Sequence, residues 1–324
     1  MLIQRMHIVI SAVLTAISVP VLGQADEHLN KVIVKLERNQ VALGSWFKSM
    51  SIYTAVGLVE SNAHVDRDTG LKTPMIDYVL IDMEHLPFDI ERLQTILMAF
   101  HSKREVLETG SLQPSIAPWV RIPCDAAGPI EPYIKQVLDA GAFGVIVPHC
   151  TNAKDAQRVI SACRYPQPKG DPQPLPKGKR GASPDMCAYL WGLTSEEYVS
   201  RADVWPLDPN GDLLAILMIE DKEGRKNIDE ILSVPGVGAI FFGLYDYSFS
   251  CGVDGDMKHP EVMEGFQAVS EACKKHHVPL IVGADEKSVE QRLKDGYRIL
   301  ISGSDVRAAG SLRQMYERMQ ELKK

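Results

Sequence analysis

Residues 213–220 read LLAILMIE, seven consecutive apolar residues that end in a glutamate. A run of this length with no charge before its last position is typical of a strand buried on both faces, as in a parallel sheet covered by helices. Glu220 then lies where the strand ends. That end of a parallel sheet carries the functional side chains in α/β proteins, so the stretch predicts both a fold class and the place of a site.

Short apolar runs of the same kind recur from about residue 40 onward, and amphipathic segments separate most of them. The eight strand-like runs are Val41–Trp46, Tyr78–Ile81, Trp119–Val120, Gly144–Val147, Leu213–Ile219, Ala239–Phe242, Leu280–Val282 and Ile299–Ile301. The helix-like segments are Asp89–His101, Ile130–Ala140, Ala153–Cys163, Asn227–Val234, Pro260–His276 and Ser288–Asp295. Eight such units in 324 residues favour one closed (β/α)8 TIM barrel, an α/β fold, over an open doubly wound sheet.

The composition excludes several classes of protein. The chain has 35 Lys and Arg against 42 Asp and Glu, a formal net charge of −7, which argues against a nucleic-acid partner. Six Cys are too few for a disulfide scaffold. Cys124 and Cys150 each follow a predicted strand, and the sequence leaves open whether they form a bridge. The chain contains no G-x-G-x-x-G or P-loop sequence that would support nucleotide binding.

The N-terminus has the three-part layout of a secretory signal. Arg5 is the only charged residue before Asp26, residues 8–19 are almost wholly apolar, and Pro20 and small residues follow. The apolar run is shorter than the ~20 residues of a membrane span, so no stable membrane insertion is expected. We expect a signal peptide over residues 1–25, a secreted or periplasmic protein, and a single TIM-barrel domain over residues 26–324. A buried N-terminal helix is the alternative.

Ionisable side chains follow five of the predicted strands at their carboxyl ends. In chain order they are Asp82, Glu84 and His85, then Arg121, then His149, then Glu220 and Asp221, and last Asp246. Because the carboxyl ends of barrel strands converge at one rim, we expect these side chains to meet there.

Glu220 and Asp246 follow adjacent predicted strands and form a candidate metal site. Two carboxylates are hard oxygen ligands that suit Mg²⁺ or Mn²⁺, with water or substrate completing the coordination. No Cys and His spacing indicates structural zinc. The alternative is a salt bridge to Arg121 without a metal.

Proton transfer and substrate binding have candidates on the same rim. Asp82 and His85 are three residues apart, and a histidine held by a carboxylate is a competent general base, although such a pair can also be structural. Arg121 could bind a substrate carboxylate or polarise a carbonyl, or instead pair with Glu84 or Asp82. None of the eight strand runs contains Lys, so a strand-borne Schiff-base lysine is not expected. Lys48 and Lys222, just past strand ends, are the residual candidates for one.

Several segments, taken in order, resemble the HpcH/HpaI aldolase/citrate lyase family, and within it the metal-dependent pyruvate aldolases. They are DYVLIDMEHLPFD (77–89), WVRIP (119–123), IKQVLDAGAFGVIVP (134–148), RYP…RG (164–181), IED (219–221), GLYDYS (243–248) and the HPEV that begins at His259. The resemblance extends from about Gly44 to the C-terminus.

The resemblance implies a (β/α)8 barrel in a homo-oligomer, a hexamer or a trimer. It also implies a lyase that cleaves a 4-hydroxy-2-oxo acid into the enolate of pyruvate and an aldehyde, with Mg²⁺, Mn²⁺ or Co²⁺ as cofactor. By the matching motifs, Glu220 and Asp246 correspond to the metal-binding acids of the family. His85 corresponds to the general base, Asp139 to the acid that pairs with it, and Asp82 lies nearby. Arg121 corresponds to the arginine that contacts the keto oxygen.

Two departures from the family pattern affect the substrate site. Met218 stands where the family commonly has glutamine beside the metal, and a methionine cannot donate a hydrogen bond there. After Gly243, Tyr245 replaces a small residue and would crowd a small acid. We expect Met218, Gly243, Tyr245 and His149 to contact the substrate, His149 as a compensating polar group, and a bulkier or aromatic hydroxy-carbonyl substrate stays open.

The predicted function is therefore a divalent-metal-dependent aldolase that acts on a small hydroxy-oxo acid or makes it from an aldehyde. An acyl-thioester lyase of the citrate lyase branch is one alternative, for which the basic loop 169–180 is the only candidate contact to coenzyme A. An exported metal- or ligand-binding protein with reduced catalysis is the other.

Overall fold

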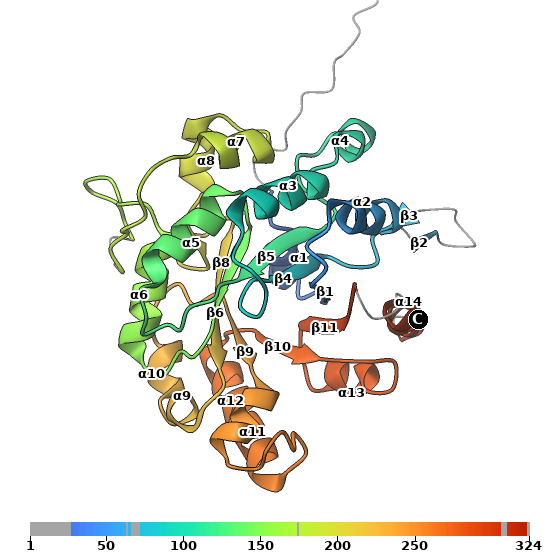
Figure 1. Cartoon of the computed structure of the whole chain (residues 1–324), viewed down its shortest axis with the longest axis vertical. Coiled ribbons are helices and arrows are strands. Elements are labelled where there is room, and N and C mark those ends of the chain that lie inside the picture. Colours follow the sequence, from blue (N-terminus) through green and yellow to red (C-terminus); the bar gives the residue numbers. More distant parts are fainter. Residues whose placement is uncertain (1–26, 63, 66–71, 174, 306–309, 323–324) are drawn as a thin grey trace, which may run out of the picture.

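Eight parallel strands close into a barrel, which confirms the predicted (β/α)8 fold (Figure 1). The strands are β1 (Ala42–Phe47), β4 (Tyr78–Asp82), β5 (Ala117–Arg121), β6 (Gly144–Val147), β8 (Leu213–Ile219), β9 (Ala239–Phe242), β10 (Leu280–Gly283) and β11 (Ile299–Ser304). They pair in this order, with β6 beside β8 and β11 back beside β1. Every predicted apolar run is one of these strands.

The computed structural model describes residues 27–62, 64–65, 72–173, 175–305 and 310–322. The predicted signal peptide, residues 1–25, lies outside these ranges and stays a prediction. Within the described ranges, no helix has the length and apolar character needed to cross a membrane.

Helices surround the barrel and also close its N-terminal end (Figure 1). The predicted helical segments contain α3 (Ile90–Phe100), α5 (Ile130–Asp139), α6 (Ala153–Cys163), α10 (Ile228–Leu232), α12 (Pro260–His276) and α13 (Val289–Lys294). Further elements are α1 (Lys31–Glu37), α2 (Ile52–Ser61), α4 (Lys103–Thr109), α7 (Asp185–Trp191), α8 (Ser195–Arg201), α9 (Lys222–Lys226), α11 (Leu244–Ser250), α14 (Gly310–Glu321) and the short strands β2 (His64–Val65), β3 (Lys72–Thr73) and β7 (Val204–Trp205).

The barrel core is built from the apolar strand residues, and its packing depends on close contacts between strands. All seven residues of β8 are buried, as the run LLAILMI requires. Tyr78 on β4 crosses β1 at Gly44, where any Cβ would overlap its ring, and its hydroxyl donates to the carbonyl of Leu300 on β11 at 2.9 Å. The Tyr78 ring stacks on Trp119 of β5, with 4.0 Å between the ring centres. These contacts link four consecutive strands.

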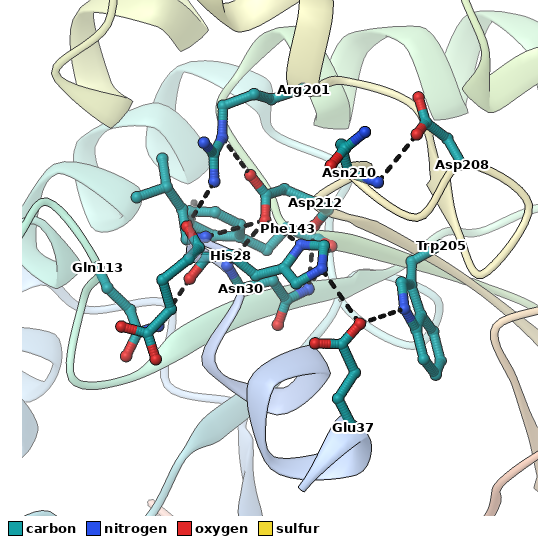
Figure 2. Close-up of polar contacts among 12 residues, drawn as sticks. His28, Asn30, Glu37, Gln113, Phe143, Arg201, Trp205, Asp208, Asn210 and Asp212 are labelled. Atoms are coloured by element: carbon teal, nitrogen blue, oxygen red, sulfur yellow. Dashed lines mark hydrogen bonds and ion pairs between the residues drawn. The ribbon is translucent and has the colours of Figure 1, made fainter. Parts of the chain in front are cut away.

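A buried ionic cluster anchors the chain segment before α1 to the N-terminal end of the barrel (Figure 2). Asp212, directly before β8, is fully buried and accepts hydrogen bonds from the Leu29 N–H at 2.9 Å and Arg201 Nε at 2.6 Å. Its Oδ1 also lies 3.0 Å from His28 Nδ1. Asn30 caps α1 and donates to the carbonyls of Phe143 and Asp212, each at 3.1 Å. The segment is thereby fixed where β6 and β8 begin.

The same cluster makes folding stability depend on the protonation of His28. Burial lowers the pKa of His28, but the hydrogen bond to Asp212 and the nearby carboxylates outweigh it, so the pKa is raised above 6.5. A raised folded-state pKa stabilises the protein fully below the unfolded-state value, and that contribution is lost as the pH rises through the folded-state value.

We predict that His28→Gln lowers the free energy of unfolding by about 2 kcal/mol at pH 6, because a hydrogen bond between charged groups is lost. The loss should be smaller at pH 9, because the contribution of the charged imidazole decreases as the pH rises through its raised pKa. Urea unfolding at both pH values measures this, with His276→Gln, which removes a surface contact to Asp229, as the control. A loss that is as large at pH 9 as at pH 6 would contradict the assignment.

Candidate active site

The predicted ionisable residues lie at the carboxyl ends of the barrel strands, on the end opposite the His28 cluster. Asp82 and Arg121 are the last residues of β4 and β5, and the parallel register places them directly beside each other. His149 follows β6, Glu220 follows β8, and Asp246 lies in the first turn of α11, which follows β9. The structure therefore brings these groups together at one rim.

Arg121 is held by two carboxylates. Its Nε donates to Asp82 Oδ1 at 3.1 Å, its Nη2 lies 2.9 Å from Asp82 Oδ2, and its Nη1 lies 2.7 Å from Glu84 Oε2. Burial raises the pKa of Asp82, but its hydrogen bond to Arg121 and that residue's charge hold the pKa below the usual range. The sequence left open whether Arg121 forms an ion pair with Glu84 or Asp82. In the structure it pairs with both carboxylates.

An aromatic ring underlies this ion pair. The Cζ of Arg121 lies 4.8 Å from the centre of the Trp46 ring, and the Nζ of Lys48 lies 4.9 Å from it. Trp46 in turn contacts Phe241 of β9, with 5.9 Å between ring centres. The sequence prediction placed Glu84 at this rim but missed Trp46 as a site residue. Trp46 was counted only as the last residue of an apolar strand, although that position alone places it at the rim.

His85 is exposed and is not oriented by Asp82 through its imidazole. Asp82 Oδ1 instead accepts the backbone N–H groups of Glu84 at 3.2 Å and His85 at 3.5 Å, which shapes the turn after β4. The His85 side chain is 64% exposed, and its Nε2 lies 3.5 Å from Glu84 Oε2. The predicted Asp82–His85 pair is therefore a backbone contact, and Glu84 is the carboxylate next to the imidazole.

Asp139 does not lie near His85 within one chain. It is the last residue of α5, which runs from the carboxyl end of β5 back to the start of β6, so it is located at the opposite end of the barrel. Its Oδ1 accepts from Arg180 Nη2 at 2.8 Å, and the same nitrogen donates to the Tyr198 hydroxyl at 2.9 Å. The expected pairing of Asp139 with His85 is thus not formed in the single chain.

Glu220 is a buried carboxylate held between the ends of three strands. Its Oε1 accepts the backbone N–H of His149 at 2.8 Å. Ile219 pairs with Phe242, so Glu220 lies beside Gly243, where a Cβ would stand 2.6 Å from Oε2. Burial raises the pKa of Glu220 to about 7, and the carboxylates of Glu84 and Asp246 add to the rise although His149 opposes it. This environment lacks enough positive charge to balance its carboxylates.

His149 reaches Glu220 through an unusual backbone conformation. Its φ of +48° is in the left-handed region, which a non-glycine residue adopts at a cost of order 1 kcal/mol. Its Nδ1 lies 3.6 Å from Glu220 Oε1 and 3.9 Å from Asp221 Oδ2. Contact with Asp221 raises the pKa of His149 to about 9, against the effect of burial. His149 is therefore a cation between the two carboxylates rather than an isolated rim histidine.

The other predicted substrate contacts differ in exposure. Met218 is only 2% exposed and packs in the barrel core, so its side chain offers little surface to a substrate. Gly243 borders Glu220, as described above. Tyr245 is 56% exposed, and its ring packs edge-to-face on Phe249, 5.1 Å between centres, and over Gly255. Tyr245 thus lies along the outer part of the rim beside Asp246.

The donor set at Glu220 and Asp246 is small. Among the residues that the structure describes, no three His, Cys, Asp or Glu side chains converge on one point. Two carboxylates with open positions suit a hard divalent cation that completes its coordination with water or substrate. The buried Glu220 carboxylate, with its raised pKa and the space kept by Gly243, fits such an ion.

The six cysteines are free thiols, including Cys124 and Cys150. Burial raises the pKa of Cys150 to about 12, so its thiol stays protonated near neutral pH.

Comparison with known proteins gives consistent matches. The family model described as HpcH/HpaI aldolase/citrate lyase matches residues 61–310. The chain is 31% identical over 272 residues to a 2-dehydro-3,6-dideoxy-6-sulfogluconate aldolase of Pseudomonas putida, which covers 84% of this chain and 89% of that protein. It is 30% identical over 232 residues to a 5-keto-4-deoxy-D-glucarate aldolase of Enterobacter sp. (strain 638), covering 71% and 78%. A crystal structure of a HpcH/HpaI aldolase/citrate lyase family protein from Burkholderia cenocepacia J2315 matches with a TM-score of 0.67 at 25% identity, covering 91% of this chain and 100% of that one.

We predict that Asp82→Asn destabilises the protein by about 3 kcal/mol, because the substitution leaves the buried Arg121 charge with only one carboxylate. Thermal or urea unfolding at pH 7 measures the change. Asp229→Asn, which removes an exposed carboxylate paired with Lys275, is the matched control and should leave stability nearly unchanged. Equal losses of stability in the two variants would show that the Asp82–Arg121 pair stabilises the protein no more than an exposed ion pair does.

Proposed function

The chain belongs to the HpcH/HpaI aldolase/citrate lyase family, and on that basis we propose that it is a divalent-metal-dependent aldolase. Its substrate is a small 4-hydroxy-2-oxo acid, which it cleaves into pyruvate and an aldehyde. The observation that carries the proposal is the Glu220 carboxylate, buried beside Gly243, bound by the His149 N–H and close to Asp246. An acid placed in this way needs a cation to balance it.

A divalent ion held by Glu220 and Asp246 would stabilise the negative charge that develops on the 2-oxo acid as the carbon–carbon bond breaks. Mg²⁺ and Mn²⁺ suit the oxygen ligands, and Co²⁺ is also compatible. His149 keeps Glu220 in place through its backbone N–H.

The remaining rim residues supply binding and proton transfer. Arg121, fixed by Asp82 and Glu84, donates to the keto oxygen or carboxylate of the substrate. His85, exposed at the rim, accepts the proton of the 4-hydroxyl group. The bond between C3 and C4 then breaks, and the aldehyde leaves. The electron pair of that bond stays on C3 and forms the enolate of pyruvate. A proton delivered to C3 completes the reaction.

The relatives support this substrate class without naming one substrate for this chain. Both proteins compared above are aldolases of oxo-acid derivatives of sugars, according to their names. The more specific expectations, Tyr245 and His149 as substrate contacts and a homo-oligomer, stay predictions.

We predict that EDTA treatment abolishes cleavage of 4-hydroxy-2-oxo acids and that Mg²⁺ or Mn²⁺ restores it. Glu220→Gln, which removes one carboxylate charge from the cation site, should lower kcat/KM by a hundredfold or more. Pyruvate release coupled to lactate dehydrogenase measures both effects. Glu290→Gln, which changes an exposed carboxylate paired with Lys294, is the control.

Three outcomes would redirect the proposal. Cleavage that survives EDTA and Glu220→Gln would contradict the role of a metal. Turnover confined to acyl-thioesters would favour the citrate lyase branch, and metal and ligand binding without turnover would favour a binding protein.

A further inference from the structure

Glu84 contacts two functional side chains of the rim at once. Its Oε2 lies 2.7 Å from Arg121 Nη1 and 3.5 Å from His85 Nε2, and its own side chain is mostly buried. In the described part of the chain, His85 forms an ion pair with no other carboxylate. The acid that faces the proposed base is therefore neither Asp82 nor Asp139, the two that the sequence places beside it.

The turn after β4 fixes the place of Glu84. The Met83 N–H donates to the carbonyl of Arg121 at 3.0 Å, which continues the pairing of β4 with β5. The Glu84 N–H donates to Asp82 Oδ1 at 3.2 Å, and the fully buried Asp82 carboxylate is itself held by Arg121 Nε. Because these contacts join two adjacent barrel strands, the position of Glu84 is set by the barrel.

Arg121 has a carboxylate partner besides Glu84. Asp82 contacts the guanidinium group with both oxygens, at 3.1 Å from Nε and 2.9 Å from Nη2. Burial raises the pKa of the Glu84 carboxyl above its usual range, and Asp82 adds to the rise, although Arg121 and His85 favour the charged form. A further positive charge beside Glu84 would therefore stabilise its carboxylate. The imidazolium that forms when His85 accepts a proton is such a charge.

We propose that Glu84 is a positioning residue for the base His85, and that its carboxylate stabilises the imidazolium formed when the 4-hydroxyl group loses its proton. This inference rests on the proposed function, in which His85 is the base. The proton moves from the hydroxyl oxygen to the imidazole and stays there while the carbon–carbon bond breaks, so no bond to Glu84 forms or breaks. A base held by a third group is a common arrangement in proton transfer. Arg121, which binds the oxo acid, and His85 are then held by the same carboxylate.

A chemical-modification experiment tests the contact without turnover. Diethyl pyrocarbonate acylates the neutral imidazole, and mass spectrometry of the digested protein gives the rate at His85 separately from the other histidines. At pH 6, Glu84→Gln should speed acylation of His85 about two- to threefold, because loss of the carboxylate lowers the fraction of imidazolium. The matched control is Asp229→Asn, which removes the carboxylate 2.8 Å from His276 Nε2. It should speed acylation of His276 and leave the rate at His85 unchanged.

A double-mutant cycle tests the role in the reaction. Release of pyruvate from a 4-hydroxy-2-oxo acid is measured for the wild-type protein, Glu84→Gln, His85→Ala and the double variant. Glu84→Gln should lower kcat about tenfold and change KM by less than about twofold, because Arg121 keeps both contacts to Asp82. In the His85→Ala background, Glu84→Gln should have no further effect, since a residue that acts through His85 loses its role with it.

The outcomes are distinguishable. If the wild-type protein cleaves no 4-hydroxy-2-oxo acid but acylation of His85 depends on Glu84, the aldolase proposal fails and the pairing of Glu84 with His85 stands. If the protein is an active aldolase and the two losses in kcat multiply in the double variant, Glu84 acts independently of His85 and the proposal is overturned. A higher KM with unchanged kcat also overturns it, because the role of Glu84 would then lie at Arg121. An unchanged rate of acylation at His85 overturns the pairing itself.

Discussion

The active end of this barrel depends on one buried carboxylate placed where β6, β8 and β9 end. Glu220 reaches its position because β8 is apolar up to its last residue and because Gly243 leaves room beside it. The His149 N–H binds one of its oxygens, which requires a left-handed backbone at a residue that is not glycine. Burial without a full ion pair is costly for a carboxylate, so this arrangement makes sense only if a cation joins it. The proposed metal chemistry follows from that electrostatic constraint.

Each cation at the same rim lies beside one or more carboxylates. Asp82 and Glu84 hold Arg121, Asp221 and Glu220 hold His149, and Lys48 is left with few contacts above Trp46. Because Arg121 is fixed on two sides, it can act as a rigid donor to an oxo acid without reorganising. The rim thus holds Arg121 rigidly where the chemistry is proposed.

The opposite end of the barrel serves stability. There the Asp212 carboxylate binds the segment before α1 through His28 and the N–H groups of Leu29 and Asn30, and it also binds Arg201. Arg180 binds Asp139 and Tyr198 at the same end. These pairs involve long-range partners and tie the loops that enter β6 and β8. Because these pairs at the N-terminal end stabilise the fold, the rim can keep a group such as Glu220 whose charge is not fully balanced.

The strands and the rim were predictable because each depends on local pattern. An apolar run followed by a charged residue marks a barrel strand and its active end, and LLAILMIE at 213–220 shows both features. Which side chains form ion pairs with each other was not predictable in the same way. Asp82 pairs with Arg121 because of the register between β4 and β5, and Asp139 faces Arg180 because α5 returns to the other end of the barrel. α1, with the β-branched sequence KVIVKLE, is helical because Asn30 caps it and the barrel buries Val32 and Ile33. Lys48 lies over Trp46 and beside Asp82 because the fold brings β1 next to β4.

The most direct test of the central claim is an anomalous diffraction map from crystals of the protein soaked with Mn²⁺. The account predicts a peak in contact with the carboxylates of Glu220 and Asp246, and its loss in crystals of Glu220→Gln grown in the same way. A strong Mn²⁺ peak elsewhere on the rim, or one that persists unchanged in Glu220→Gln, would contradict it.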